Sequence, residues 1–402
     1  MENLGRILGS IFLLAGTAIG AAMLALPIST GILGLYPSLC LFVLSWFALL
    51  YSAYLFLELT LWSEGEVNIV TMASIILGPS GKIICWSFYL YLLYALVTAY
   101  IAGGGLVVAN FLQAIGFNDI SLPLASLGVC LVLGFLVMKG IFIVDMFNRV
   151  FMLVLFCSLI SLIAMLSMHI EPNNFKQMSF DFLPNASSVV ITSFGFHIVI
   201  PSLCTYLKHN VSQLKKVLLI GSSMPLVFYI VWEVVTLGTV PIEGSHGLRQ
   251  AYEQGIPISS LLQFIGADGQ EETISILAMV FSLLAIFTSF FGVGVSLIDF
   301  LKDGLKLSND IKSQAICFIL GFLVPLVIAL LNPQAFLRGL EYAGAFGVVT
   351  LLMVLPAVMV WVGRYHKGFS GPYKAPGGKL ILGTYIFFSW GFIFLEIINK
   401  LA

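Results

Sequence analysis

The chain has 402 residues, of which 60% are hydrophobic and only 9% are charged, and its mean hydropathy is +1.07. A soluble domain of this length would carry about a quarter charged residues to keep its surface solvated, so the composition excludes a soluble globular protein. The formal net charge of −1 gives no reason to expect nucleic acid as a partner, and the lipid bilayer is the expected surroundings.

Eleven apolar segments are long enough to cross a bilayer as helices, because one span needs about 17–25 residues. In chain order we predict spans at residues 7–32, 37–62, 83–114, 121–139, 143–168, 187–207, 216–240, 273–300, 313–331, 336–362 and 379–399. Each segment is continuously apolar, which is typical of membrane helices and not of barrel strands. The loops are too short for a soluble domain, so function must lie within the bundle. The outer loop at 242–264 contains a short amphipathic pattern that we interpret as a lid.

The distribution of lysine and arginine predicts the orientation of these spans. With the N-terminus in the cytoplasm, 14 of the 18 basic residues lie on the inner side. The outer set contains only Lys176, Arg249, Arg338 and Lys400. Because cytoplasmic loops carry an excess of basic residues, we predict that the N-terminus lies inside and the C-terminus outside.

The first span contains the stretch AGTAIGAAMLALP, residues 15–27, with glycine and proline where a membrane helix usually has large apolar residues. Glycine destabilises a helix by about 1 kcal/mol and proline by about 3 kcal/mol relative to alanine. In lipid, the freed backbone groups also need a partner or a cavity. The stretch therefore predicts a helix broken near Gly20.

The sixth span, SSVVITSFGFHIVIPSLCTYL at 187–207, repeats this pattern around Gly195 and Pro201. It follows the first span by five, an odd interval that reverses the direction through the membrane. We therefore predict two five-helix halves of opposite topology, at 1–170 and 171–364, followed by a cytoplasmic loop and the last span at 365–402. Paired breaks in inverted halves indicate the substrate site of a secondary transporter. The alternative is that the glycines and prolines only serve helix packing.

Three motifs carry a resemblance to a known family. AGTAIGAAMLALP, TSFGFHIVIPSL at 192–203 and TSFFGVGVSLIDF at 288–300 resemble the first, sixth and eighth helices of the hydroxy/aromatic amino acid permeases, in the amino acid/polyamine/organocation superfamily. The similarity extends over essentially the whole chain and is closest to bacterial tyrosine-specific and tryptophan/tyrosine permeases, which implies a multi-pass protein of the bacterial cytoplasmic (inner) membrane. It implies an all-α membrane protein with a 5+5 inverted repeat and broken helices 1 and 6, like the sodium-coupled leucine transporter.

The same resemblance implies secondary active import of aromatic amino acids by cation symport, with tyrosine, tryptophan and phenylalanine as candidate substrates and a proton as the favoured coupling ion. A serine/threonine permease of the same family and a sodium-coupled aromatic symporter are the alternatives. The spans contain no HExxH motif, no paired aspartates and no GxSxG motif at a plausible depth, so we expect neither an enzyme nor a cofactor beyond the coupling ion. No obligatory protein partner is evident.

The break in the first span predicts how a substrate is held. The half-helix after the break begins at mid-membrane, where free amides carrying a partial positive charge suit a carboxylate. We assign this role to the amides of Gly20, Ala21 and Ala22. Thr17 would add a hydroxyl contact.

We expect the rest of the substrate to lie between spans three and six. Span three would contribute the Tyr100 ring and a void beside Gly103 and Gly104. The sixth-span break would contribute aromatic rings and backbone carbonyls from Phe194, Gly195 and Phe196. The aromatic substrate class itself rests on the family resemblance.

Span eight carries a stripe of small and hydroxyl residues that either packs helices or binds a cation. The resemblance implies a sodium site formed by first-helix carbonyls and an Ala-x-x-Thr-Ser motif, which here match Gly16, Ile19, Ala285, Thr288 and Ser289. Oxygen ligands of this kind suit hard cations. Because tyrosine permeases of this family are usually regarded as proton symporters, the site binds either sodium or no ion.

A proton route needs an ionisable group within the membrane, where such residues are rare and by default functional. Glu233, Glu341 and Glu396 lie in outer halves of spans, and we prefer Glu58 and His197 as candidates. For His197 a structural role, with its ring nitrogens hydrogen-bonded, is the alternative. For Glu58 the favoured alternative is acceptance of hydrogen bonds from the unwound sixth helix.

Overall fold

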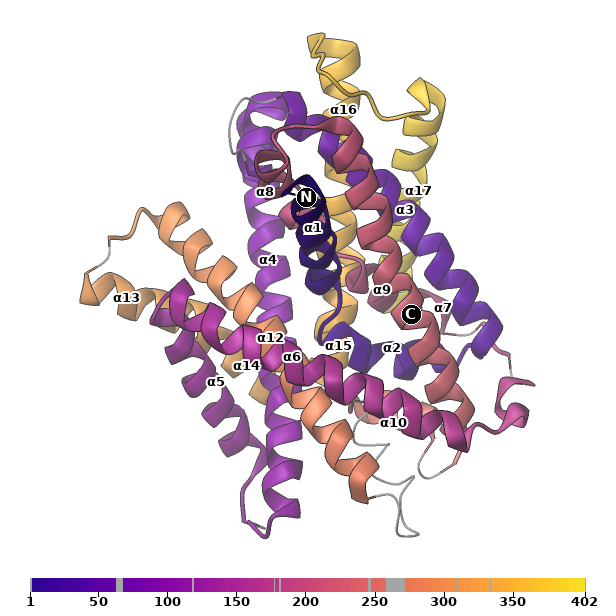
Figure 1. The fold of residues 1–402 in the computed structure, drawn as a ribbon. Coiled ribbons are helices and arrows are strands. Elements are labelled where there is room, and N and C mark those ends of the chain that lie inside the picture. The colour runs from indigo at the N-terminus through magenta and orange to yellow at the C-terminus, as the bar shows by residue number, and fades with distance from the viewer. Residues whose placement is uncertain are drawn as a thin grey trace.

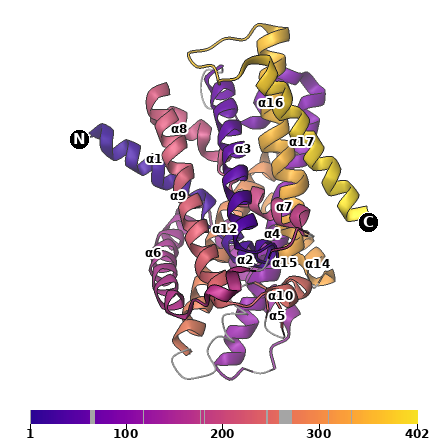
Figure 2. The same cartoon turned by 90° about the vertical axis from the view of Figure 1, so that its right-hand side faces the viewer.

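The computed structural model describes residues 2–62, 68–117, 119–176, 178–180, 182–244, 247–257, 272–308, 310–332 and 334–401. In these ranges the regular elements are all helical, and they pack side by side into one bundle (Figure 1). The N-terminal and C-terminal helices lie at opposite edges of that bundle (Figure 2).

The first half of the chain forms five spans. They are α1 (Glu2–Ala18) with α2 (Ala22–Gly31), α3 (Leu35–Trp62), α4 (Ile69–Ala114), α5 (Leu122–Met138) and α6 (Ile141–Leu166). Two short 3-10 helices follow, η1 (Ser167–His169) and η2 (Pro172–Lys176). All ten residues of α2 are buried, so the short half-helix after the first break forms part of the centre of the protein.

The second half contains the remaining spans. The sixth consists of α7 (Leu183–Ser193), η3 (His197–Val199) and α8 (Ile200–Tyr206), and the seventh is α9 (Val211–Thr239). A short helix, α10 (Leu248–Gln254), lies in the loop before α12 (Glu272–Leu305). The ninth span consists of α13 (Ile311–Phe318), η4 (Ile319–Leu323) and α14 (Val324–Leu331). The tenth consists of α15 (Ala335–Tyr342), η5 (Ala343–Val354), α16 (Leu355–Val362) and η6 (Gly363–Lys367). The last is α17 (Gly378–Leu401).

These elements confirm the predicted fold class. In the described part of the chain nine helices are long and apolar enough to span a membrane, the bent pair α1 and α2 makes a tenth, and α5 is a shorter apolar helix. The first and sixth spans are broken where the glycines predicted it. The division into halves at 170 and 364 stays a prediction.

Two details differ from the sequence prediction. Helix α4 begins at Ile69, not at 83, because the Asn68 side chain caps it by accepting from the Thr71 amide at 2.8 Å. It then bends at Gly78, whose φ of 77° is readily adopted by glycine and precedes Pro79. The predicted lid contains α10, whereas residues 245–246 and 258–264 of that loop lie outside the described residues.

Candidate functional site

The first break separates α1 from α2, whose axes are bent by 56°. Gly20 lies in the break, and a Cβ atom there would overlap the Ser289 hydroxyl of α12. The neighbouring Ala21 amide donates to the same hydroxyl, with 2.8 Å between N and Oγ. Glycine is therefore required at position 20 because α12 approaches the broken backbone closely.

Proline in α2 frees a second backbone group. Pro27 has no N–H, so it leaves the Met23 carbonyl, four residues earlier, without its helical donor. The indole Nε1 of Trp232 in α9 donates to that carbonyl at 3.0 Å. The buried oxygen is thus paired, which avoids a penalty of about 1–3 kcal/mol.

Tyr229, one turn from Trp232 on α9, joins the two broken spans. Its hydroxyl lies 2.7 Å from the Ala18 carbonyl, where α1 ends, and 2.9 Å from the Ser193 carbonyl, where α7 ends. Both carbonyls have lost helical donors because their helices stop at these residues. The two breaks therefore meet at one buried point in the bundle.

The second break runs from Phe194 to Phe196, between α7 and the 3-10 turn η3. Its two rings are fully buried against protein: Phe194 packs edge-on against Tyr229, and Phe196 stacks on His197. The carbonyls of Phe194 and Phe196 each accept one local backbone bond. In the described residues the Gly195 carbonyl accepts none, so it is the backbone oxygen of this break that is available to a ligand.

Backbone groups are also available at the first break. Within the described part of the chain, the amides of Gly20 and Ala22 donate to no acceptor, and the carbonyls of Gly16 and Ile19 accept no donor. Two donors and two acceptors at this break match the carboxylate and the ammonium group of an amino acid in kind. The Ala21 amide is different, because it is already engaged by Ser289.

Ser289 and its neighbours close the site on the α12 side. The Thr288 hydroxyl turns back to its own helix, where the carbonyls of Leu284 and Ala285 lie 2.8 and 3.2 Å away as acceptors. Tyr100 of α4 is buried, and its hydroxyl interacts with Ser289. The structure thus brings Tyr100 and Ser289 to the first break.

Two predicted substrate contacts are corrected by the structure. The void expected beside the glycines of α4 is filled, because Gly103 is packed against the Phe336 ring and Gly104 against Val129 and Ile286. These glycines allow close packing of helices. Thr17 is exposed, and its hydroxyl donates to the Leu13 carbonyl of α1 at 2.7 Å, so it points along its own helix.

The expected hydrogen bonds from the sixth span to Glu58 are also wrong. The Glu58 carboxylate instead forms a two-pronged ion pair with Arg364 of η6 and accepts from the Ala375 amide at 2.7 Å. The side chains are 2% and 4% exposed. This pair ties the end of α3 to the segment that leads into α17.

His197 begins η3 and is fully buried between aromatic rings. Its ring stacks on Phe196 with centroids 4.9 Å apart and meets the edge of Phe56 at 6.2 Å. In the described residues neither ring nitrogen has a hydrogen-bond partner of normal geometry, although the backbone of Leu49 lies close. The hydrogen-bonded structural histidine considered from the sequence is therefore not what the structure has.

A cavity of about 570 Å³ opens beside the second break. It reaches Ile198 and Pro201, where η3 passes into α8, and lies beside the last turns of α3 and α12 and the beginning of α4, on the side where α1 begins. One wall is aromatic, because Phe300 stacks on Trp86 and meets the edge of Tyr89. The cavity thus reaches the second break from the side of the bundle on which α1 begins.

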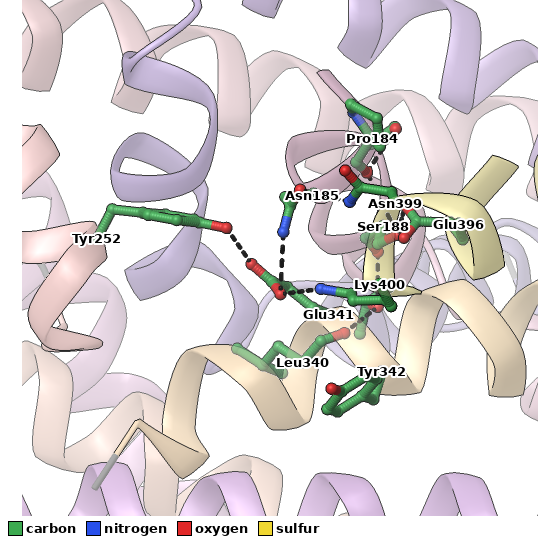
Figure 3. Close-up of polar contacts among 12 residues, drawn as sticks. Pro184, Asn185, Ser188, Tyr252, Leu340, Glu341, Tyr342, Glu396, Asn399 and Lys400 are labelled. Carbon is green, nitrogen blue, oxygen red and sulfur yellow. Dashed lines mark hydrogen bonds and ion pairs between the residues drawn. The ribbon is translucent and has the colours of Figure 1, made fainter. Parts of the chain in front are cut away.

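The opposite side is closed by a polar network (Figure 3). The Glu341 carboxylate of α15 accepts from the Tyr252 hydroxyl of α10 at 2.8 Å and pairs with Lys400 of α17 at 2.7 Å. Asn185 of α7 donates to the same carboxylate at 3.4 Å. Burial, and next the Glu341 charge, raises the pKa of Tyr252, which keeps it a hydrogen-bond donor. The network joins α10 to α7, the half of the sixth span that precedes the break.

Sequence reasoning missed Tyr229, Trp232 and Phe336. Tyr229 and Trp232 lie in the seventh span, and the one signal for them is that their polar atoms need partners when buried. Phe336 gives no such signal, because a phenylalanine in an apolar span is indistinguishable from any other core residue.

Comparisons with known proteins agree on the family and the fold. A family model described as the tryptophan/tyrosine permease family matches residues 4–396. Tyrosine-specific transport system 1 of Haemophilus influenzae is 34% identical over 94% of this chain and 93% of its own length. Glutamine transporter 2 of Aliivibrio fischeri is 30% identical over 95% and 97%. The crystal structure of MhsT in complex with L-phenylalanine aligns with a TM-score of 0.67 at 14% identity, over 97% of this chain and 98% of that one.

Proposed function

The chain belongs to the tryptophan/tyrosine permease family, so it is a multi-pass membrane transporter and not an enzyme, and from this premise we propose that it imports tyrosine by proton symport. Tryptophan and phenylalanine are the further substrates we propose. The observation that carries the proposal is the meeting of both broken spans at Tyr229, with unpaired backbone groups beside it.

In our proposal the substrate carboxylate binds the Gly20 amide at the start of α2, where the helix dipole adds to the attraction. The carbonyls of Ile19 and Gly195 accept from the ammonium group. The Ala22 amide is a second donor for the carboxylate, whereas the Ala21 amide stays bonded to the Ser289 hydroxyl and holds the break in this geometry. The aromatic wall around Phe300 supports an aromatic substrate, because rings stack favourably on one another.

We propose that the N-terminus is cytoplasmic, as the basic residues predict. The 570 Å³ cavity then opens to the cytoplasm, and the Glu341 network closes the outside. This arrangement corresponds to the inward-facing stage of alternating access.

Uptake of labelled tyrosine into proteoliposomes tests the substrate class. We expect excess tyrosine, tryptophan and phenylalanine to compete and serine to have little effect. Competition by serine alone would favour the serine/threonine permease instead. Because one relative is named a glutamine transporter, glutamine belongs in the same panel, and dominant competition by it would overturn the aromatic assignment.

The coupling ion is tested by uptake in sodium-free buffer with and without an uncoupler. Proton symport predicts uptake without sodium and its loss with the uncoupler. The sodium alternative has support in the unpaired carbonyls of Gly16 and Ile19, in the break that Ser289 of α12 contacts. It predicts that uptake requires sodium and persists with the uncoupler.

A further inference from the structure

Glu233 of α9 is a buried carboxyl group that the site described above does not use. Its exposed fraction is 0%, and it lies one turn beyond Tyr229, facing α2. Its Oε1 atom is 2.5 Å from the Thr30 hydroxyl, near the end of α2. Its Oε2 atom is buried without a hydrogen-bond partner in the described residues.

The proton count at Thr30 indicates the state of this carboxyl. The Thr30 oxygen also lies 2.6 Å from the Leu26 carbonyl, which can only accept. A hydroxyl has a single hydrogen, so if Thr30 donates to Leu26, the contact with Glu233 needs a hydrogen from the carboxyl. Both contacts are satisfied when Glu233 is a neutral acid that donates to Thr30.

Among the described side chains, no ionised partner balances a charge on Glu233. The α2 helix has no titratable side chain, and the group of α3 that faces Glu233 is Ser38. The titratable and charged groups whose side chains the structure describes, in the elements packed against α9, are Arg6 of α1; Tyr36, Cys40, Tyr51, Tyr54 and Glu58 of α3; Asp145, Arg149 and Cys157 of α6; His169 of η1; and Lys176 of η2, with Glu171 between η1 and η2. In the described residues Glu233 is hydrogen-bonded to Thr30 and to none of these groups. An unpaired carboxylate at this position would cost several kcal/mol in the dry interior, which favours the neutral acid.

A row of polar side chains leads from Glu233 to the outer end of α9. Thr236, one turn on, has a buried hydroxyl without a partner in the described part of the chain. Thr239 follows at the helix end, which lies about 9 Å beyond Glu233 at 1.5 Å per residue. In the other direction Tyr229 contacts both breaks. Polar side chains thus lie along α9 from its outer end, past Glu233, to Tyr229 at the two breaks.

We propose that Glu233 is the group that carries the coupled proton. This inference rests on the proton symport proposed above and identifies its protonatable site. A proton from outside water neutralises the carboxylate, and the acid then donates to Thr30 and holds α2 against α9. Loss of that proton to inside water leaves a carboxylate that must be hydrated, so it favours a conformation in which α2 separates from α9. Because α2 begins at the substrate-binding break, proton and substrate act on the same helix.

The test compares the wild type, Glu233→Gln and Glu243→Gln in proteoliposomes with the membrane potential clamped. Glu243 is a matched control, because it is an exposed outer-loop carboxylate paired with Arg249. For one proton per substrate, a gradient of one pH unit supports about tenfold tyrosine accumulation. We expect the wild type and Glu243→Gln to accumulate tyrosine. We expect Glu233→Gln, which imitates the neutral acid, to exchange tyrosine across the membrane but not to accumulate it.

Failure of proton symport and failure of the Glu233 assignment give different results. If the wild type ignores the pH gradient and follows sodium, proton symport fails and the inference with it. If the wild type and Glu233→Gln accumulate tyrosine equally, only the inference is overturned.

Two further measurements apply even if Glu233→Gln does not fold. Thr30→Val removes the hydroxyl partner, and we expect it to shift the pH dependence of uptake while gradient-driven accumulation persists; an unchanged pH profile would count against the proposal. Dicyclohexylcarbodiimide reacts with protonated carboxyls in apolar surroundings, so in the wild type we expect an adduct on Glu233 in parallel with loss of uptake. Loss of uptake with Glu233 unmodified would overturn the proposal.

Discussion

Replacement of Gly20 by alanine is the perturbation whose effect the structure defines most clearly. The new Cβ would overlap the Ser289 hydroxyl, so that hydroxyl must turn away from the Ala21 amide. Loss of a hydrogen bond with a buried donor left unpaired costs about 1–3 kcal/mol. The Ser289 contact also positions the neighbouring Gly20 amide, which we propose binds the substrate carboxylate. If binding needs that position, the same free energy is lost from the complex, and we expect the Kd for tyrosine to rise by a factor of roughly 5 to 150.

A double-mutant cycle isolates this contact. In the Ser289→Ala background, the remaining Ser289 Cβ would lie 3.7 Å from the new methyl group, an ordinary contact. Gly20→Ala should therefore have little further effect there, and the two changes should be non-additive by about 1 kcal/mol or more. The control is Gly292→Ala on the same helix as Ser289, where a Cβ meets nothing within 4 Å.

The assay is equilibrium binding of labelled tyrosine to purified protein, with thermal unfolding measured in parallel. Additive effects of Gly20→Ala and Ser289→Ala, or wild-type affinity in Gly20→Ala, would refute the reasoning. A fall in thermal stability with unchanged affinity would show that the break is structural and does not bind tyrosine.

Three further changes test other contacts. Tyr229→Phe removes the hydroxyl shared by both breaks and should lower the free energy of unfolding by about 1–3 kcal/mol, whereas Tyr36→Phe, at an exposed position, should not. Arg364→Gln leaves Glu58 buried and unpaired, so stability should fall by about 3–5 kcal/mol, and the pair Glu58→Gln with Arg364→Gln should recover part of it; no recovery would contradict the ion-pair assignment. Gly103→Ala should lower the free energy of unfolding by about 1–3 kcal/mol through overlap with Phe336 and leave the Kd for tyrosine unchanged. A raised Kd with unchanged stability would instead support the void predicted from the sequence.

The breaks were predictable because glycine and proline act on the backbone locally. The helices end at Ala18 and Ser193 as those residues indicate. The partners of the freed carbonyls were not predictable, because Tyr229 and Trp232 come from another span whose rotation no local pattern determines. The same rotation also decides which backbone amides and carbonyls at the breaks are left without a hydrogen-bond partner.

The glycines of α4 illustrate a different limit. A glycine in a membrane helix indicates either open space or a close approach of another helix, and the local sequence is the same in both cases. The Phe336 ring that fills the space beside Gly103 is more than 200 positions away in the chain. Glu58 shows the same dependence on distant contacts, since its partner Arg364 belongs to the tenth span.

The central claim is that an aromatic amino acid binds where the two broken spans meet. Photolabelling of the reconstituted protein with azidotyrosine, followed by peptide mass spectrometry, tests it directly. We predict that the label is found on residues 15–27 and 192–203 and that excess tyrosine prevents it. Tyrosine-sensitive labelling confined to the aromatic wall at Trp86 and Phe300, with none at either break, would contradict the claim.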